Sequence, residues 1–293
     1  KVSDRPELEN KDVERVIMRI MRKEEEEREG GREELKDMAG FSMIQSKINQ
    51  KSPILFGKGA NGKNQFVKIL EKIIGRENYH KSSAKRLSND KYEMSPILDS
   101  EMAFFDEFES VSDPASLKTL IGDETQNMRQ MQKESTTEKL TSYPIFTANK
   151  MPNVDDDSSS AFYRRWEIIN FRQKFTEKEN DGNPDMRPME ELEEEYMSQE
   201  ALDSFATDIA HRLEDLRKNP KFTDQQSPKE AKKEWKKKQI PEYSFFEKYL
   251  KQGDLPTDDK NTQADFITKG ELRGLVNDYR EHNNMEETTK GHI

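Results

Sequence analysis

The sequence has no cysteine, and its 293 residues include only four histidines. Without cysteine the chain cannot form disulfides, bind zinc through thiolates or use a thiol nucleophile. The histidines show no HExxH pair or similar metal-binding spacing. We therefore expect no catalytic metal that is held by protein side chains alone. The histidines are His80, His211, His282 and His292.

Long apolar runs are absent too. No segment approaches the roughly 20 apolar residues of a membrane-spanning helix. The first five residues, Lys-Val-Ser-Asp-Arg, do not resemble a signal peptide. These absences predict a cytoplasmic protein with no membrane partner. Because the chain starts at Lys1 rather than Met, we expect it to be part of a longer protein.

Apolar residues are scarce and charged residues are abundant. Hydrophobic residues make up 31% of the sequence and charged residues 37%, and the mean hydropathy is -1.13. This composition predicts a core built from a few apolar segments. The 59 acidic and 49 basic side chains give a net charge of -10, which argues against coating nucleic acid with the whole surface but permits a local basic groove.

The first part of the chain is predicted to be helical. Between residues 10 and 43, apolar residues recur every three or four positions, and Gly30-Gly31 divides the segment into two helices. The charged run Glu24 to Glu27 fits a solvated helix face. We expect a small helical bundle here.

Four short apolar runs follow, at residues 53–57, 102–105, 143–146 and 166–171. Each has the length of a buried strand, and an amphipathic helix that stops at Gly75 follows the first. Strands that alternate with helices predict an α/β domain with a parallel sheet.

The remainder of the chain is more polar. Helices are predicted at residues 189–197 and 201–216, and Pro220 and Pro228 mark a linker. Residues 243–285 alternate short helices with turns, which indicates a small separate domain.

The strongest motif lies between the first predicted strand and the helix after it. It matches GxxxxGK, a loop whose backbone N–H groups converge on phosphate oxygens while the lysine reaches the β and γ phosphates. A glycine-rich turn without a ligand is the alternative, which the strand-loop-helix context disfavours. The predicted nucleotide-binding residues are Gly57, Gly59, Ala60, Asn61, Gly62, Lys63, Asn64 and Gln65.

Position 64 departs from this motif, because Asn64 stands where a Ser or Thr hydroxyl normally binds magnesium. An amide oxygen is a weaker Mg²⁺ ligand, and water can also hold the ion. We predict that the protein binds ATP and Mg²⁺, with Asn64 and Asp106 as the metal ligands, and reduced turnover is an open alternative.

Polar residues also follow the later apolar runs. Asp106 and Glu107 end the second run, where the first would hold magnesium and the second would activate the attacking water; Glu109 is a second candidate for this base. Asn149 follows the third run and is placed to bond the γ phosphate or the water, although a turn cap would use the same residue.

Two arginines precede the fourth run. They suit an arginine finger that reaches the phosphate of a neighbouring subunit, and surface ion pairing is the alternative. The predicted catalytic residues are Lys63, Glu107, Asn149, Arg164 and Arg165.

In this order the motifs resemble superfamily 3 helicases of the AAA+ class, the helicase part of phage, plasmid and large-DNA-virus primase-helicases. The resemblance covers about residues 35 to 175, and Asn64 and the Thr147-Ala148 pair mark a divergent member. Residues 57–63 are similar to the group's GxGxNGK[ST], residues 104–107 to its Walker B motif, residues 117–123 to its KxxxGD, residues 147–152 to its sensor motif TNxxP and residues 164–166 to its paired-arginine finger.

The resemblance implies a hexameric ring around single-stranded DNA, with each ATP site completed by the next subunit's arginine. It places Arg129 and Lys133 on a pore hairpin that contacts the DNA, and it allows a primase domain before residue 1. The implied organisation is a helical segment at 1–45, an AAA+ P-loop core at 46–175, a helical extension at 176–228 and a winged-helix-like region at 229–293.

Two functions remain open. The first is an ATP-dependent DNA helicase for viral or plasmid replication. The second is a nucleotide-binding ring that loads onto DNA without efficient hydrolysis, which Asn64 favours. A small-molecule kinase is disfavoured because no acceptor-binding constellation is evident. The lysine-rich run 229–238, which contains Trp235, is either a second DNA contact or a solvated helix face.

Overall fold

The computed structural model describes residues 12–44, 47–89, 94–111, 114–122, 125–128, 136–154, 160–175, 193–240, 243 and 269–282. The chain forms two compact units, Lys1–Lys232 and Lys233–Ile293. In chain order the elements are α1 (Asp12–Glu27), α2 (Gly31–Ser42), β1 (Ser52–Phe56), α3 (Lys63–Ile74), the 3-10 helix η1 (Arg76–Asn78), β2 (Tyr79–Ser83), α4 (Ala84–Asn89), α5 (Met94–Ile97), β3 (Met102–Asp106), β4 (Ser110–Val111), α6 (Pro114–Ile121), β5 (Thr125–Met128), β6 (Thr136–Lys139), β7 (Tyr143–Ala148), β8 (Asn153–Val154), α7 (Ser160–Tyr163), β9 (Trp166–Asn170), α8 (Glu193–Tyr196), α9 (Gln199–Lys218), α10 (Pro228–Gln239) and α12 (Lys269–His282).

A five-stranded sheet forms the centre of the first unit, in the order β2-β3-β7-β1-β9. All its neighbouring strands are parallel, which confirms the predicted α/β class with a parallel sheet. The four predicted strands are present as β1, β3, β7 and β9. The fifth, β2, lies at the sheet edge and was not predicted, because its sequence Tyr-His-Lys-Ser-Ser has no apolar run.

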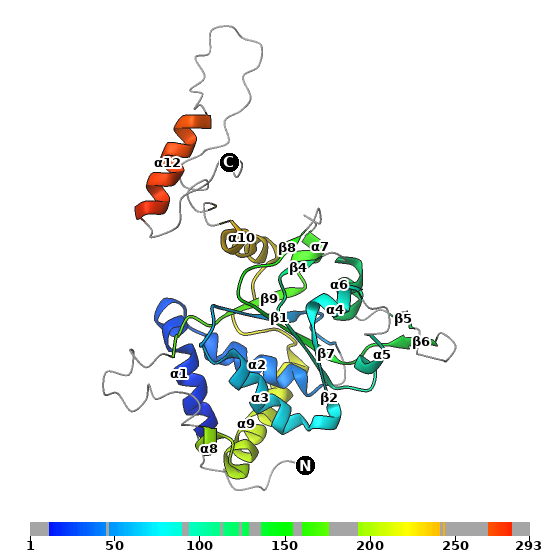
Figure 1. Cartoon of the computed structure of the whole chain (residues 1–293). Coiled ribbons are helices and arrows are strands. Elements are labelled where there is room, and N and C mark those ends of the chain that lie inside the picture. The colour runs from blue at the N-terminus through cyan, green and yellow to red at the C-terminus, as the bar shows by residue number, and fades with distance from the viewer. Residues whose placement is uncertain are drawn as a thin grey trace. The chain divides into compact units, whose positions relative to one another are not determined.

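One face of the sheet carries the main hydrophobic core. Leu55, Ile145 and Ile169 on this face pack with the apolar side chains of α1, α2, α3 and α9, and Figure 1 shows these helices together on one side of the strands. Because helices and loops cover both faces, the strands read as short apolar runs rather than as alternating patterns. The core is thus built from a few apolar segments, as the composition predicted.

The other face carries a cluster of aromatic rings. Phe146 lies 5.0 Å from Phe105 and 5.3 Å from Trp166, measured between ring centroids. Trp166 lies 5.4 Å from Phe108 and 5.6 Å from Phe162. Such pairs add about 0.5–1.5 kcal/mol each beyond the area they bury. The cluster therefore fixes β3, β7 and β9 relative to one another.

The predicted helical pair at the N-terminal side is confirmed as α1 and α2, with Gly30 between them in the left-handed region at φ 97. One expectation for α1 was wrong. Glu24, which begins the charged run predicted to be solvated, is only 1% exposed. The reason is tertiary: partners from β9 and the segment after it surround its carboxylate.

The segment from Pro220 to Pro228, predicted as a linker, packs on the first unit instead. The ring of Phe222 lies 5.0 Å from that of Phe41 on α2, and the N–H of Thr223 donates to the carboxylate of Asp37 at 2.6 Å. These contacts make the segment part of the folded body.

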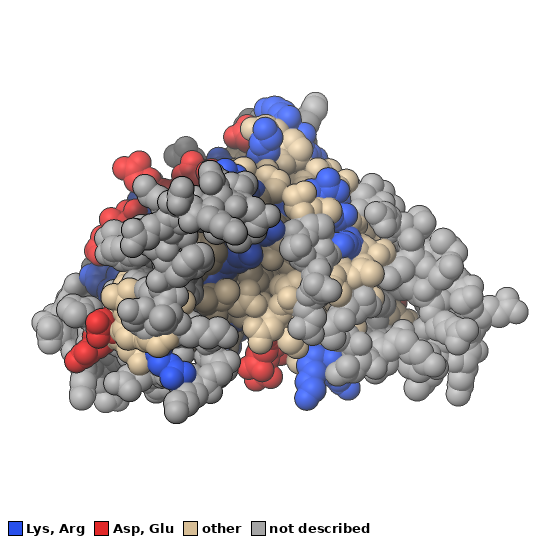
Figure 2. Space-filling model, turned by 90° about the horizontal axis from the view of Figure 1, so that it is seen from above, with Lys and Arg blue, Asp and Glu red and all other residues tan. Residues whose placement is uncertain are grey.

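Two small sheets accompany the main one: β4 with β8, parallel, and β5 with β6, antiparallel. Arg129 and Lys133 fall between β5 and β6 in sequence and lie outside the described residues. Among the helices that the structure describes, none is long and apolar enough to cross a membrane. Figure 2 shows Lys and Arg side chains along the middle of the visible face although the net charge is -10, so the negative charge is unevenly distributed.

Candidate functional site

The backbone of the loop between β1 and α3 packs closely against the residue that follows β9. At Gly57 an added Cβ would lie 2.4 Å from the carbonyl oxygen of Phe171, so only glycine fits. Ala60 and Gly62 adopt left-handed φ angles of 58 and 85. The amide of Asn61 donates to the same Phe171 oxygen at 3.2 Å. The loop is thus held from the β9 side, while its tip at positions 58–60 is exposed.

Lys63, the first residue of α3, has a buried amino group with neutral partners. The residue is 6% exposed. Its Nζ donates to the carbonyl oxygen of Gly57 and, at 3.2 Å, to Oδ1 of Asn149. Burial lowers the pKa of Lys63 to about 8. An anionic ligand would supply the negative charge that this amine lacks inside the fold.

The predicted polar residues meet at one edge of the sheet. Phe56, the last residue of β1, pairs with Ala148 on one side and Asn170 on the other, so Asn149 follows directly beside the loop. Asp106 ends β3, two strands from β1, or about 10 Å away at the usual strand spacing. The carboxyl edge of an open parallel sheet is where ligands bind in such folds.

Glu107 stands out among the acids at this edge. It is exposed and has a φ of 53, a left-handed conformation that costs a non-glycine residue about 1 kcal/mol or more. The next residue, Phe108, holds it there, because Phe108 is buried in the aromatic cluster and its N–H donates to the carbonyl oxygen of Thr147 at 2.9 Å. Glu109 is also exposed, but without left-handed backbone. The strain favours Glu107 over Glu109 as the functional acid.

The first turn of α3 presents backbone donors. The first hydrogen bond within the helix runs from the N–H of Phe66 to the carbonyl of Gly62 at 3.0 Å, so the amides of Asn64 and Gln65 have no partner in the helix. The Asn64 side chain is exposed. The Gln65 side chain instead accepts a hydrogen bond from Tyr196 at 3.3 Å. Gln65 would therefore serve a phosphate through its backbone.

The predicted arginines lie at the opposite edge of the sheet. They precede Trp166, which pairs with Ser52, the first residue of β1. The length of a five-residue strand, about 16 Å, separates them from the glycine-rich loop 57–62. Arg164 is exposed, whereas Arg165 is 7% exposed and donates to the carbonyl of Ala161 at 2.5 Å. The structure does not bring either arginine to the site of its own chain.

The sequence analysis did not identify the residues at the end of β9 and just after it that border the loop. Asn170 ends β9 at the same edge as Phe56, and the N–H of Phe175 donates to the carbonyl of Ala60 at 2.7 Å. A signal was available, since any polar residue after the fourth parallel strand must reach this edge. The hydrogen bond from Asn170 to Glu24 gave no such signal, because the two residues are distant in sequence.

A comparison with protein families covers this site. Residues 55–165 match the model of DUF5906, a family of unknown function. No curated protein matches the chain. Three solved structures of the NrS-1 C-terminal region are similar: two described as the A form apo structure, each with a TM-score of 0.49, and an apo structure with a TM-score of 0.48, all at 18% identity.

These alignments cover 71% of this chain and 45% or 46% of the other chains, so the chain spans less than half the length of the structures it resembles. The DUF5906 match includes the glycine-rich loop 57–62, Asp106 and Glu107, Asn149 and both arginines. Over residues 55–165 this chain is therefore similar to a family whose function is not assigned.

Proposed function

We propose that this protein is an ATPase of the superfamily 3 type that drives unwinding of DNA during viral or plasmid replication. The observation that carries the proposal is the Lys63 amine, which lies buried at the mouth of a glycine-rich loop with neutral partners. A buried lysine without a counter-ion is costly. Binding of a triphosphate would offset that cost, which gives the loop a reason to hold the amine there.

The other residues of the edge have roles that fit hydrolysis. The amides of Asn64 and Gln65 would bind phosphate oxygens, and Asn64 and Asp106 would hold Mg²⁺, which neutralises charge on the β and γ phosphates when bound. Glu107 would orient and deprotonate the attacking water. Asn149, which already accepts a hydrogen bond from Lys63, would bond the γ phosphate and so couple its presence to strand β7.

The position of Arg164 supports assembly into a homo-oligomer, which we propose to be a hexameric ring. Arg164 is exposed at the edge of the sheet opposite the phosphate loop, so it would serve the site of a neighbouring copy rather than its own. In this arrangement Arg129 and Lys133 would contact single-stranded DNA through its phosphates. A primase domain in the full-length protein belongs to the same proposal.

The test is ATP hydrolysis with and without single-stranded DNA, together with strand unwinding. We expect Lys63→Ala to lower DNA-stimulated hydrolysis at least about 100-fold, since it removes a charge that stabilises the transferring phosphoryl group. Lys68→Ala is the matched control, because Lys68 lies on the same helix with a 51% exposed side chain and pairs only loosely with Glu193 at 3.7 Å. Equal rates for wild type and Lys63→Ala would refute the proposal.

A second function, a nucleotide-binding ring that loads onto DNA with little hydrolysis, is favoured by Asn64. Its exposed amide occupies the position where a hydroxyl normally binds Mg²⁺. If this function is correct, wild type binds ATP but turns it over slowly, and Asn64→Ser raises the rate. Rapid turnover by wild type would eliminate this alternative and leave the helicase.

A further inference from the structure

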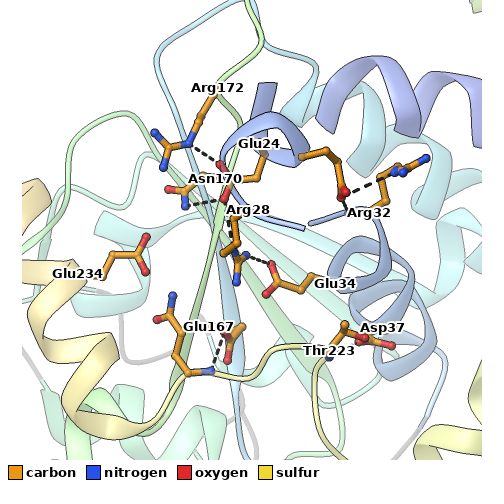
Figure 3. Close-up of polar contacts among 12 residues, drawn as sticks. Glu24, Arg28, Arg32, Glu34, Asp37, Glu167, Asn170, Arg172, Thr223 and Glu234 are labelled. Carbon is orange, nitrogen blue, oxygen red and sulfur yellow. Dashed lines mark hydrogen bonds and ion pairs between the residues drawn. The ribbon is translucent and has the colours of Figure 1, made fainter. Parts of the chain in front are cut away.

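A buried carboxylate on α1 joins the N-terminal helix to the end of β9. Glu24 is 1% exposed. Its Oε1 accepts from Nδ2 of Asn170 at 3.1 Å, and its Oε2 accepts from Nε of Arg172. Figure 3 shows both side chains pointing toward Glu24. The two partners come from the strand next to β1 and the residues just after it.

Those residues run along the phosphate loop. The carbonyl of Phe171 accepts from the side-chain amide of Asn61 at 3.2 Å, and the N–H of Phe175 donates to the carbonyl of Ala60 at 2.7 Å. Arg172 lies between these two contact points in sequence. Glu24 therefore holds Arg172, a residue inside the segment 171–175, and the two ends of this segment bond the loop.

The same helix also touches the loop directly. Ile20 lies one turn before Glu24 on the same helix face. A Cβ added to Gly62 would lie 2.7 Å from Cγ1 of Ile20, so the helix packs closely on the residue that precedes Lys63. Helix α1 thus contacts the loop at Gly62 through Ile20. Through Glu24 it also holds the segment 171–175, which bonds the loop at Ala60 and Asn61.

Further charges hold Glu24 in place. Nε of Arg28 lies 3.6 Å from its carboxylate, and Nη2 of Arg28 lies 2.5 Å from the buried carboxylate of Glu34 on α2. Glu27 pairs with Nη1 of Arg172 at 2.8 Å. Figure 3 shows Arg28 between Glu24 and Glu34. Removing one charge from such a network leaves the others buried with fewer partners.

We propose that Glu24 is a positioning residue for nucleotide binding: it holds residues 171–175 against the phosphate loop, so nucleotide affinity depends on helix α1. The inference rests on the proposed function, because it needs a nucleotide at the loop. Glu24 does not touch the ligand; it acts through Asn170 and Arg172 on the carbonyls and amides that shape the loop.

The test measures equilibrium binding of a fluorescent ATP analogue with Mg²⁺ to the full chain, well below its unfolding temperature. We expect Glu24→Gln to raise the dissociation constant about 5- to 20-fold, the size of a typical coupling between sites. Glu24→Gln and Arg172→Gln should be non-additive, because both remove the same contact. The double variant should bind about as weakly as Arg172→Gln alone.

A matched control separates positioning from loss of stability. Asp37 is also a fully buried carboxylate, paired with Arg212 at 2.6 Å and bonded by the N–H of Thr223 at 2.6 Å. In the part of the chain that the structure describes, the hydrogen bonds and ion pairs of these three residues involve no residue of the loop 57–62. Asp37→Asn should lower the unfolding temperature but leave the dissociation constant within about twofold of wild type.

The outcomes distinguish the two proposals. If wild type binds the analogue, Lys63→Ala does not, and Glu24→Gln binds as tightly as wild type, the role of Glu24 is overturned while the proposed function stands. Equal weakening by Glu24→Gln and Asp37→Asn would also overturn it. If wild type and Lys63→Ala both fail to bind, the proposed function falls and this inference falls with it.

Discussion

Two buried lysines lie at opposite ends of strand β1 and have opposite kinds of partner. Lys51, just before the strand, is 5% exposed and pairs with the buried carboxylate of Glu167 at 2.9 Å. Lys63, just after the loop, is 6% exposed and bonds the neutral oxygens of Gly57 and Asn149. Because burial is nearly equal, the partner makes the difference. Lys51 is neutralised within the fold, whereas Lys63 pairs with no carboxylate in the described part of the chain.

The two ends of the strand differ in the same sense in their surroundings. At the amino end, Trp166 and the internally bonded Arg165 are packed against the sheet. At the carboxyl end, Glu107 and Asn149 are exposed. Left-handed backbone occurs at both ends, at Gln50 before β1 as well as at Ala60 and Glu107, so it does not distinguish them. The unneutralised charge lies where function is expected, and the paired, packed residues lie where the fold is stabilised.

The arginine pair tests this division at the amino end. We expect Arg164→Ala to lower ATP hydrolysis by about 10³-fold, the lower range for an arginine finger, without changing the unfolding temperature. Arg165→Ala should instead destabilise the protein, because Arg165 is buried and bonded to Ala161. Hydrolysis rates and thermal unfolding of both variants provide the check. If Arg164→Ala hydrolyses ATP normally, Arg164 does not complete the site of a neighbour.

The difference between the partners of Lys51 and Lys63 can be tested by removing one cation at a time. Lys51→Met should lower the free energy of unfolding by about 3–5 kcal/mol, since Glu167 is left buried without its counter-ion. Lys63→Met should cost much less, because no buried carboxylate loses a partner. Urea unfolding of both variants measures the difference. Adding Glu167→Leu to Lys51→Met should restore most of the stability, and equal losses for the two single variants would contradict the comparison.

Glu34 extends the comparison to a buried acid. Burial raises the pKa of Glu34 to about 8, although the hydrogen bond and charge of Arg28 oppose the shift. The folded state then binds this proton more tightly than the unfolded state, so the contribution of Glu34 to stability is fully present below the ordinary carboxyl pKa. This contribution is lost as the pH rises from that value through about 8, by at most about 1.4 kcal/mol per pH unit.

Urea unfolding at about pH 6 and about pH 8 checks this expectation. Glu34→Gln, which keeps the shape of the neutral acid, should show a weaker decline than wild type over this window. Identical slopes for the two proteins would mean that Glu34 is ionised in the fold throughout.

Local patterns in the sequence predicted much of the fold. The glycine-rich loop 57–62, helix α3 and strands β1, β3, β7 and β9 lie where apolar runs and glycines placed them. These signals are local: a buried parallel strand is apolar along its length, and an amphipathic helix shows its periodicity. Lys63 and Asn149 are in contact, and Asp106 lies two strands away at the same edge, because parallel strands share one carboxyl edge.

The missed features depend on contacts that no local pattern encodes. Strand β2 is polar because it lies at the edge of the sheet. Glu24 looks like any surface glutamate, yet its partners Asn170 and Arg172 lie more than a hundred residues away. The split between Arg164 and Arg165 also required the structure, since adjacent residues of one type differ only in the direction they face.

The most direct test of the central claim is proton uptake when nucleotide binds. A lysine with a pKa of about 8 is mostly neutral at about pH 8.5, and the phosphates of the ligand would restore its charge. Calorimetric titration of a non-hydrolysable ATP analogue in two buffers of different ionisation enthalpy should then show net proton uptake at that pH. Lys63→Arg should show none. Binding by wild type with no proton uptake would contradict the claim that the phosphates of the ligand supply the counter-charge of Lys63.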